Sequence, residues 1–267
     1  MAADQKPSQI QSVGRALLLL EILAGADKDL GISEISRLTG LSKSTVHRLL
    51  AVLESRGFVE YVPDLRRYRL GLKSFEVGSA VLNRMDLSKK AVTPMEELAK
   101  ATRETINLAV LDGLEVVYIQ RIESSETLRT DLKVGRRVPI FCSALGKAIL
   151  AFLPSGARGD ILGRLDFLPY TGRTITSPEK LLAQLSTIQK TGYSLDNEEY
   201  IDGICCVGAP VFNHRGMVIA ALSVAGPAMR FGVDKITVLS GLVRQTAAKI
   251  SRGLGYLGPY PGNAGEG

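Results

Sequence analysis

Hydrophobic residues in the first quarter of the chain recur at the spacing of helices. Residues 12–24 are apolar nearly all round, and a helix of this kind must bury more than one face. We expect one face to join its own core and the other to meet a partner subunit. Two shorter amphipathic segments follow at 33–39 and 43–56, separated by Gly40, whereas residues 1–8 are expected to be disordered.

The two short segments begin and end with residues that cap helices. Ser33 and Ser42 are the predicted N-caps, and Gly40 follows the first of the two helices. The next stretch, "FVEYVPDLRRYRLG", predicts a hairpin with strands near 58–62 and 67–70 that are joined at "PDLR". Helix, helix–turn–helix and hairpin, in this order, make a winged helix-turn-helix.

The rest of the chain alternates between helical and strand-like patterns. Thr93 and Pro94 predict the cap and the first residue of a helix, and Asp112-Gly113 predicts a tight hairpin turn. The pattern as a whole predicts an α+β fold in which helices pack on an antiparallel sheet. The predicted parts are a winged helix-turn-helix over 10–72, a linker helix over 73–88, a second domain over 89–253 and a disordered tail over 254–267.

Composition and charge narrow the class of protein only slightly. The 267 residues carry a net charge of +6, which suits a polyanionic partner but is shared by many unrelated proteins. Three cysteines, two of them adjacent, form no disulfide framework and indicate a reducing cytoplasm. The start of the chain lacks a signal-peptide pattern, and the apolar run "ALLLLEILAGA" is too short to span a bilayer, so we expect no membrane association.

The second helix of a helix-turn-helix enters the major groove of DNA, where its first turns contact bases and phosphates. The positions here that lie outside the apolar stripe are Lys43, Ser44, Thr45, His47 and Arg48, and the hairpin adds Arg66, Arg67 and Arg69. Lys and Arg pair with phosphates or guanine edges, and hydroxyls donate or accept. The alternative is a solvated helix beside a hairpin edge that charge protects. Because helices, cap and hairpin occur in order, we favour a surface that contacts double-stranded DNA.

Three N-terminal stretches, "SVGRALLLLEILA", "ISEISRLTGLSKSTVHRLLAVLESRGFVE" and "RRYRLG", resemble the IclR family of bacterial transcriptional regulators. Two later stretches, "VGRRVPIFCSALGKAILAFLP" and "GYSLDNEEYIDGICCVGAPVFNHRGMVIAALSVAGP", resemble the same family, and the resemblance covers about residues 10–252. It implies a GAF-like C-terminal domain that binds a small-molecule effector. It also implies a homodimer or dimer of dimers on a palindromic operator of a catabolic operon, with DNA binding that responds to the effector.

The resemblance also implies the lining of the effector pocket. The positions are Ser143, Ala144, Leu145 and Gly146 at a helix start, together with Asp196, Cys206 and Ser223. Backbone N–H groups at that helix start would receive a carboxylate, although without the resemblance the stretch is better read as an ordinary tight turn before a core helix. Some members have a second hydroxyl where this chain has Ala225, and Phe141 and Cys142 replace more polar residues. We therefore expect an aromatic or longer aliphatic carboxylate.

No arrangement typical of catalysis accompanies these motifs, so we expect no enzyme activity, catalytic residue or cofactor. Cys205 and Cys206 are neighbours on a predicted strand and point to opposite faces, so they do not easily bind one metal ion together. Two alternatives stay open. One is a carboxylate-processing enzyme that uses its winged helix for protein contacts, and the other is a DNA-binding protein with a closed, empty pocket.

Overall fold

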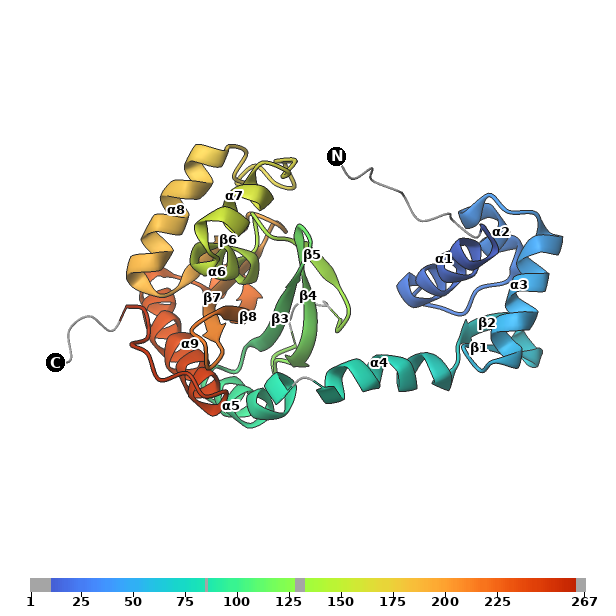
Figure 1. The fold of residues 1–267 in the computed structure, drawn as a ribbon, viewed down its shortest axis with the longest axis horizontal. Helices are drawn as coiled ribbons and strands as arrows, with labels where there is room; N and C mark the ends of the chain where they lie inside the picture. Colours follow the sequence, from blue (N-terminus) through green and yellow to red (C-terminus); the bar gives the residue numbers. More distant parts are fainter. Residues whose placement is uncertain (1–10, 85, 128–132, 263–267) are drawn as a thin grey trace, which may run out of the picture. The chain divides into compact units, whose positions relative to one another are not determined.

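The computed structural model describes residues 11–84, 86–127 and 133–262. The chain divides into two compact units, Met1–Arg84 and Met85–Gly267, whose secondary structure is shown in Figure 1. The predicted disorder of residues 1–8 concerns a segment outside the described residues. None of the described helices combines the length and the apolar character that crossing a membrane requires.

The N-terminal unit is a winged helix-turn-helix, as the sequence predicts. Its elements are α1 (Gln11–Gly25), α2 (Ile32–Thr39), α3 (Lys43–Ser55), β1 (Val59–Val62), a 3-10 turn (Pro63–Leu65), β2 (Arg67–Leu70) and α4 (Leu72–Arg84). Apolar residues from all three leading helices and both strands form one core, in which Leu19, Ile35, Leu50 and Tyr68 are buried. The strands pair antiparallel, with Tyr61 opposite Tyr68.

The two predicted helix caps have different outcomes. Ser42 caps α3, because its hydroxyl accepts a hydrogen bond from the Thr45 backbone N–H at 3.3 Å. Ser33 is not the N-cap that the sequence predicts, since α2 begins at Ile32 and its N-cap is Gly31, two residues before Ser33. The Glu34 carboxylate reaches back and accepts the Gly31 N–H at 2.9 Å, so a side chain inside the helix replaces the expected hydroxyl.

The C-terminal unit is an α+β domain, again as predicted. Its elements are α5 (Asp86–Thr102), β3 (Thr105–Asp112), β4 (Glu115–Ile122), β5 (Arg137–Pro139), α6 (Ala144–Phe152), α7 (Ser155–Leu162), α8 (Pro178–Thr191), β6 (Ser194–Asn197), β7 (Ile204–Phe212), β8 (Val218–Pro227), a 3-10 turn (Ala228–Arg230) and α9 (Val233–Gly253). The strands form one antiparallel sheet in the order β5-β4-β3-β8-β7-β6.

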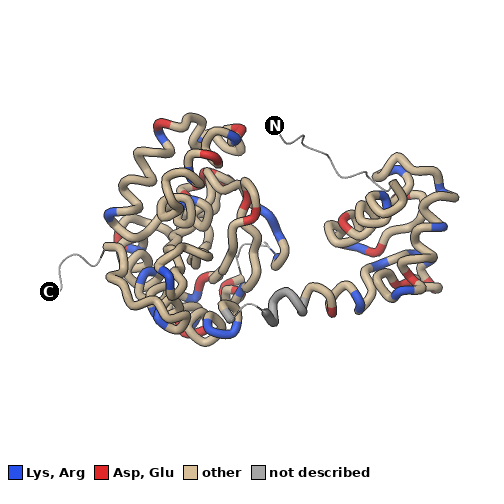
Figure 2. Tube along the Cα trace, viewed as in Figure 1, with Lys and Arg blue, Asp and Glu red and all other residues tan. Residues whose placement is uncertain are grey.

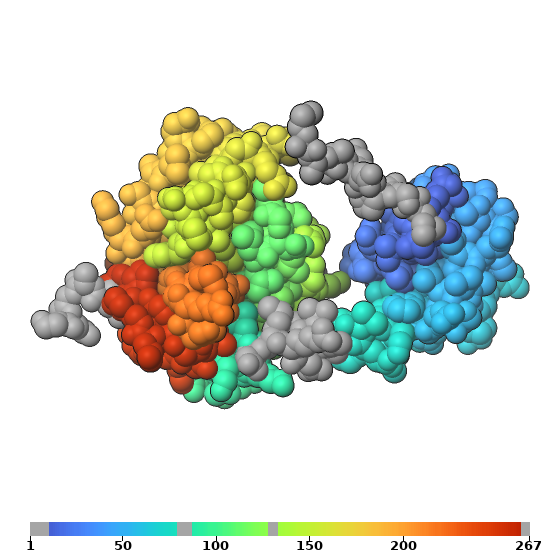
Figure 3. Space-filling view, viewed as in Figure 1, coloured from blue at the N-terminus to red at the C-terminus, as the bar shows by residue number. Residues whose placement is uncertain are grey.

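Helices cover both faces of this sheet. Most residues of β7 and β8 are buried whichever way their side chains point, and both strands contact α6 and α9. We therefore place α6 on one face and α9 on the other, with α5 beside α9 and α8 beside α6 (Figure 1). In the space-filling view the last helix, in red, lies against the strands that precede it, in orange (Figure 3).

The helix that opens the C-terminal unit begins earlier than predicted. Pro94 was expected at its first position, but α5 starts at Asp86 and Pro94 is buried inside it. Proline there cannot donate the usual helical hydrogen bond, so packing of its ring must offset that loss. The predicted linker helix over 73–88 stays a prediction, because Met85 lies outside the described residues. The described part of this range comprises α4, which ends at Arg84, and the first residues of α5, where Leu87 is already part of the core.

The prediction of a disordered tail over 254–267 is wrong for the part of it that the structure describes. Residues 254–262 return to the domain, where the Tyr260 hydroxyl donates to the Pro210 carbonyl and both Tyr256 and Tyr260 pack on the ring of Phe212. The Pro/Gly-rich composition predicted disorder, but two tyrosines bury enough apolar surface to fix the segment. Residues 263–267 lie outside the described part of the chain.

Candidate DNA-binding surface and ligand site

One side of α3 is polar and accessible. Lys43, Ser44, His47 and Arg48 are exposed and Thr45 is half-buried, because Val46 and Leu50 turn the opposite side into the core. The Thr45 hydroxyl lies 2.9 Å from that of the cap residue Ser42. Figure 2 shows Lys and Arg positions on α3 and on the β1–β2 hairpin. The first turns of the helix thus present cations and hydroxyls together, as recognition of phosphates and base edges requires.

The three arginines of the hairpin lie close in sequence but differ in their surroundings. Arg66 is exposed and adopts a left-handed conformation with φ of 51° at the turn. Arg67 donates to the Glu34 carboxylate at 3.0 Å, and Arg69 donates twice to Glu60, at 3.1 and 2.9 Å. The Arg69 hydrogen bonds lower the pKa of the Glu60 carboxyl. DNA would therefore compete with carboxylates for Arg67 and Arg69, whereas Arg66 has no ion-pair partner among the described residues.

Two grooves beside α3 connect the predicted residues with others. One lies between α1 and α3 and is lined by Arg15, Thr45 and Arg48. The other is lined by His47 of α3 and Arg66 of the hairpin. Arg15 was not predicted as a contact residue. Its signal in the sequence is a lone cation near the start of an otherwise apolar helix.

The predicted pocket residues of the C-terminal unit share one face of the sheet. Asp196 pairs with Cys206 and Cys206 pairs with Ala225, while Ser223 pairs with Gly208 two residues along the same strands. Directly paired residues of antiparallel strands point to the same face, and so do residues two apart. Cys206 keeps accessible surface although β7 is an inner strand.

The start of α6 lies on this same face. The Ser194 hydroxyl donates to the Ala144 carbonyl at 2.6 Å, and a Cβ placed on Gly208 would lie 2.9 Å from that carbonyl oxygen. The absence of a side chain at Gly208 therefore lets the helix start approach the sheet closely. The structure thus brings the two groups of predicted residues, 143–146 and those on the strands, against each other.

The N-cap of α6 already accepts a hydrogen bond from one of the backbone N–H groups that were expected to bind the effector. The Ser143 hydroxyl accepts the Gly146 N–H at 3.1 Å and donates to the Pro139 carbonyl at 2.8 Å. A Cβ on Gly146 would lie 2.2 Å from the Ile140 carbonyl oxygen, so this turn requires glycine. Of the backbone N–H groups predicted to bind the effector, that of Gly146 is therefore already hydrogen-bonded within the protein. Leu145 is buried in the core.

Burial dominates the electrostatics of this face. It raises the pKa of Asp196 to about 7, although the Glu199 backbone N–H, 2.8 Å from the carboxylate, acts in the opposite direction. Burial likewise raises the pKa of Cys142 to about 12 and that of Cys206 well above its ordinary value. Both thiols therefore stay protonated at neutral pH, and neither is an activated nucleophile.

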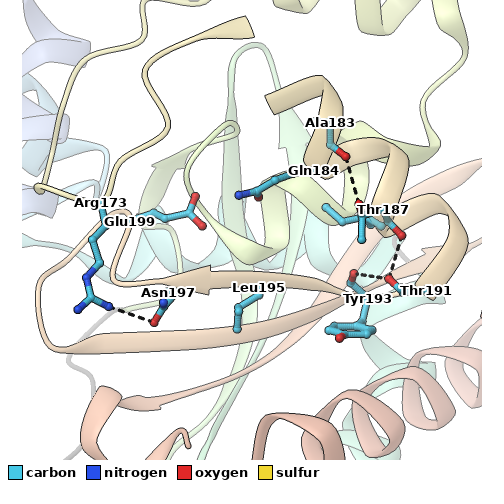
Figure 4. A pocket seen from close by; sticks show the side chains of 10 residues that line it. Arg173, Ala183, Gln184, Thr187, Thr191, Tyr193, Leu195, Asn197 and Glu199 are labelled. Carbon is cyan, nitrogen blue, oxygen red and sulfur yellow. Dashed lines mark hydrogen bonds between the residues drawn. The ribbon is translucent and has the colours of Figure 1, made fainter. Parts of the chain in front are cut away.

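A buried ion pair that sequence reasoning missed holds this region together. The Lys147 side chain is wholly buried, and its Nζ donates to Glu199 at 2.6 Å and to the Gln184 side chain at 2.8 Å. It thereby joins α6 to α8 and to the turn after β6. Glu199 and Gln184 also line an open groove of about 690 Å³ between α8 and β6, seen in Figure 4. None of the predicted pocket residues lines this groove.

Asn107 on β3 is a second polar residue that the sequence analysis missed. It lies directly opposite Ser223 and is 1% exposed. The signal was an amide within the apolar strand "TINLAVLD". Tyr118 on β4 is buried near Asp196 and Cys206, and burial raises its pKa. Within the described ranges, no cluster of three or more His, Cys, Asp or Glu is arranged to hold a metal ion.

Comparison with known proteins identifies the family. The family described as "IclR helix-turn-helix domain" matches residues 12–63, and "Bacterial transcriptional regulator IclR C-terminal" matches residues 79–252. The HTH-type transcriptional regulator KdgR of Escherichia coli (strain K12) is 38% identical over 253 residues, which cover 95% of this chain and 96% of that protein.

Solved structures agree with this assignment. The crystal structure of the Thermotoga maritima IclR has a TM-score of 0.79 at 36% identity and covers 92% of this chain and 99% of its own. An IclR homolog from Microbacterium hydrocarbonoxydans, complexed with 4-hydroxybenzoate, has a TM-score of 0.78 at 28% identity and covers 91% and 98%. The chain therefore belongs to the IclR family of bacterial transcriptional regulators, which are DNA-binding proteins and not enzymes.

Proposed function

We propose that this regulator controls a catabolic operon in response to a small carboxylate, and that it acts in the cytoplasm as a homodimer or dimer of dimers on a palindromic operator. The observation that carries the proposal is the convergence of the start of α6 with Asp196, Cys206 and Ser223 on one buried sheet face. A 4-hydroxybenzoate complex of a homolog supports a carboxylate of aromatic size.

The proposed operator contacts come from α3 and the hairpin. Lys43, Ser44, Thr45, His47 and Arg48 would meet the major groove, and Arg66 would meet the backbone beside it. Arg67 and Arg69 would contribute by exchanging their carboxylate partners for phosphates. Arg15, which lines a groove with Arg48, joins this set as a phosphate contact.

The exposed side of α1 supports the proposed dimer. Val13 and Leu17 are each 54% exposed and Leu18 is 38% exposed, while Leu19 on the other side is in the core. Three large apolar side chains on one short helix face are costly in water, and a second copy of the same surface would cover them.

The proposed response follows from differential binding. An effector that binds two arrangements of a dimer equally well does not change their relative populations. Its contacts must therefore differ between the arrangement that fits the operator and the one that does not. The junction between α6 and the sheet suits this role, because one ligand there contacts a helix end and several strands at once.

Fluorescence anisotropy with DNA from upstream of the protein's own gene tests the proposal. Titrations at several salt concentrations, with random DNA beside them, are repeated with a panel of aromatic and aliphatic carboxylates. We expect specific, salt-dependent binding that at least one carboxylate strengthens or weakens. If the specific complex forms but ignores every carboxylate, the effector class proposed here is wrong while the DNA-binding role stands.

A further inference from the structure

Two side chains in the middle of the sheet have unmet hydrogen-bonding capacity. Neither the amide nitrogen nor the amide oxygen of Asn107 has a partner among the described residues, and the same is true of the Ser223 hydroxyl. Each residue is 1% exposed. Buried polar side chains in folded proteins are nearly always hydrogen-bonded, so two adjacent exceptions indicate a function.

The pairing of the strands places these groups within the proposed effector site. Asn107 is directly opposite Ser223, and Ser223 is directly opposite Gly208, which lies under the start of α6. Asn107, Ser223 and Gly208 therefore form one row on the face that Asp196 and Cys206 share. Because Gly208 has no side chain, the Ala144 carbonyl of the helix start and the Ser194 hydroxyl come close to the sheet beside Ser223.

The chemistry of the two groups defines what would satisfy them. The Asn107 amide offers two donors and an acceptor, and the Ser223 hydroxyl offers one donor and accepts as well. A carboxylate accepts only, so it would leave the amide oxygen unpaired. An alcohol or phenol hydroxyl both donates and accepts, and it would satisfy the amide oxygen and one donor together.

We propose that Asn107 is a specificity-determining residue, which with Ser223 recognises a hydroxyl group on a carboxylate effector. This rests on the proposed function, because the carboxylate itself would go to the start of α6. The effector class becomes hydroxylated carboxylates, which is narrower than the aromatic or aliphatic carboxylates that the pocket's apolar residues indicate. An apolar residue at position 107 would cost the fold nothing in hydrogen bonds, so the amide is there for a ligand.

The test uses two matched pairs of probes, 4-hydroxybenzoate with benzoate and 4-hydroxybutyrate with butyrate. Binding to the full-length protein is measured by calorimetry, and operator binding is followed by anisotropy. We expect the wild type to bind the hydroxylated member of at least one pair about tenfold more tightly. In Asn107→Leu this ratio should fall close to one, with operator affinity and melting temperature retained.

Asn197→Leu is the matched control, because Asn197 lies on the opposite face of the same sheet, where its amide oxygen accepts from the Cys205 thiol. It should keep the wild-type ratio. If the leucine variant at position 107 fails to fold, Asn107→Ala is measured in the same way.

The outcomes separate this inference from the proposed function. A wild type that binds carboxylates without preferring the hydroxylated member, or an Asn107→Leu variant that keeps the preference, would overturn the role of Asn107 and leave the carboxylate proposal intact. A protein that binds none of the four probes while still binding its operator would overturn both.

Discussion

Arg48 and Arg69 are both exposed arginines of the N-terminal unit, but only Arg69 has a carboxylate partner among the described residues. We expect Arg48→Ala to weaken operator binding at least tenfold, because a base or phosphate contact is lost. Its melting temperature should stay within about 2 °C of the wild type, since the exposed Arg48 side chain makes no hydrogen bond or ion pair with the described residues. Arg69→Ala is the control and should lose less affinity for the operator. Equal losses in anisotropy titrations would mean that the hairpin contributes as much as α3.

The buried carboxyl of Asp196 leads to a prediction about how the stability of the protein depends on pH. Its pKa is about 7 in the folded protein, above its ordinary value of 3.8, so the folded state holds a proton that the unfolded state releases. Ionisation of Asp196 therefore costs no folding free energy below about pH 4, and the cost grows between about pH 4 and pH 7 and then levels off. We expect Asp196→Asn to become more stable relative to the wild type from pH 5 to pH 8, by about 2 kcal/mol.

Urea denaturation at a series of pH values measures this difference. Asparagine keeps an oxygen that can accept the Glu199 N–H, so the hydrogen bond that orders the turn is retained. Asp234→Asn, in the exposed first turn of α9, is a control that should show no such growth with pH. A difference that stays constant from pH 5 to pH 8 would mean that Asp196 ionises normally in the folded protein.

At the scale of elements, the contact between α6 and the sheet depends on Gly208. A Cβ there would lie 2.9 Å from the Ala144 carbonyl oxygen and 2.8 Å from the Ser194 hydroxyl oxygen. Gly208→Ala must therefore push the helix start away, and we expect a loss of about 1–3 kcal/mol in unfolding free energy together with weaker effector binding. Gly241→Ala in α9 meets nothing within 4 Å and should instead stabilise by up to about 1 kcal/mol. If both variants stabilise, the close approach is not essential.

Local patterns predicted the elements well because caps and turns act over a few residues. Ser42 and Gly40 mark helix ends in the structure as they do in the sequence. The partnership of Asn107 with Ser223 could not be predicted, because it depends on the register of strands more than 100 residues apart in sequence. The burial of Lys147 was likewise invisible, since its partner Glu199 follows 52 residues later.

At the scale of the whole molecule, assembly is expected to depend on α1. We expect Leu17→Glu to shift the protein toward monomer and to reduce operator binding, because a charge would be buried at the proposed subunit contact. Leu182→Glu on α8 is the control, as Leu182 is 44% exposed against 54% for Leu17. Sedimentation measured at several protein concentrations gives the oligomeric state directly. A Leu17→Glu protein that sediments as the wild type would place the subunit contact elsewhere.

The regular spacing of the strands also bears on how long a ligand of the proposed site has to be. Asn107 on β3 and Asp196 on β6 are three strand intervals apart, about 14 Å across the sheet, and Asp196 lies two residues further along β6 than Ser194, which ends the row through Asn107. We therefore expect the proposed site to discriminate by length as well as by chemistry, because a molecule that touches both ends must span three strand intervals less the reach of the side chains.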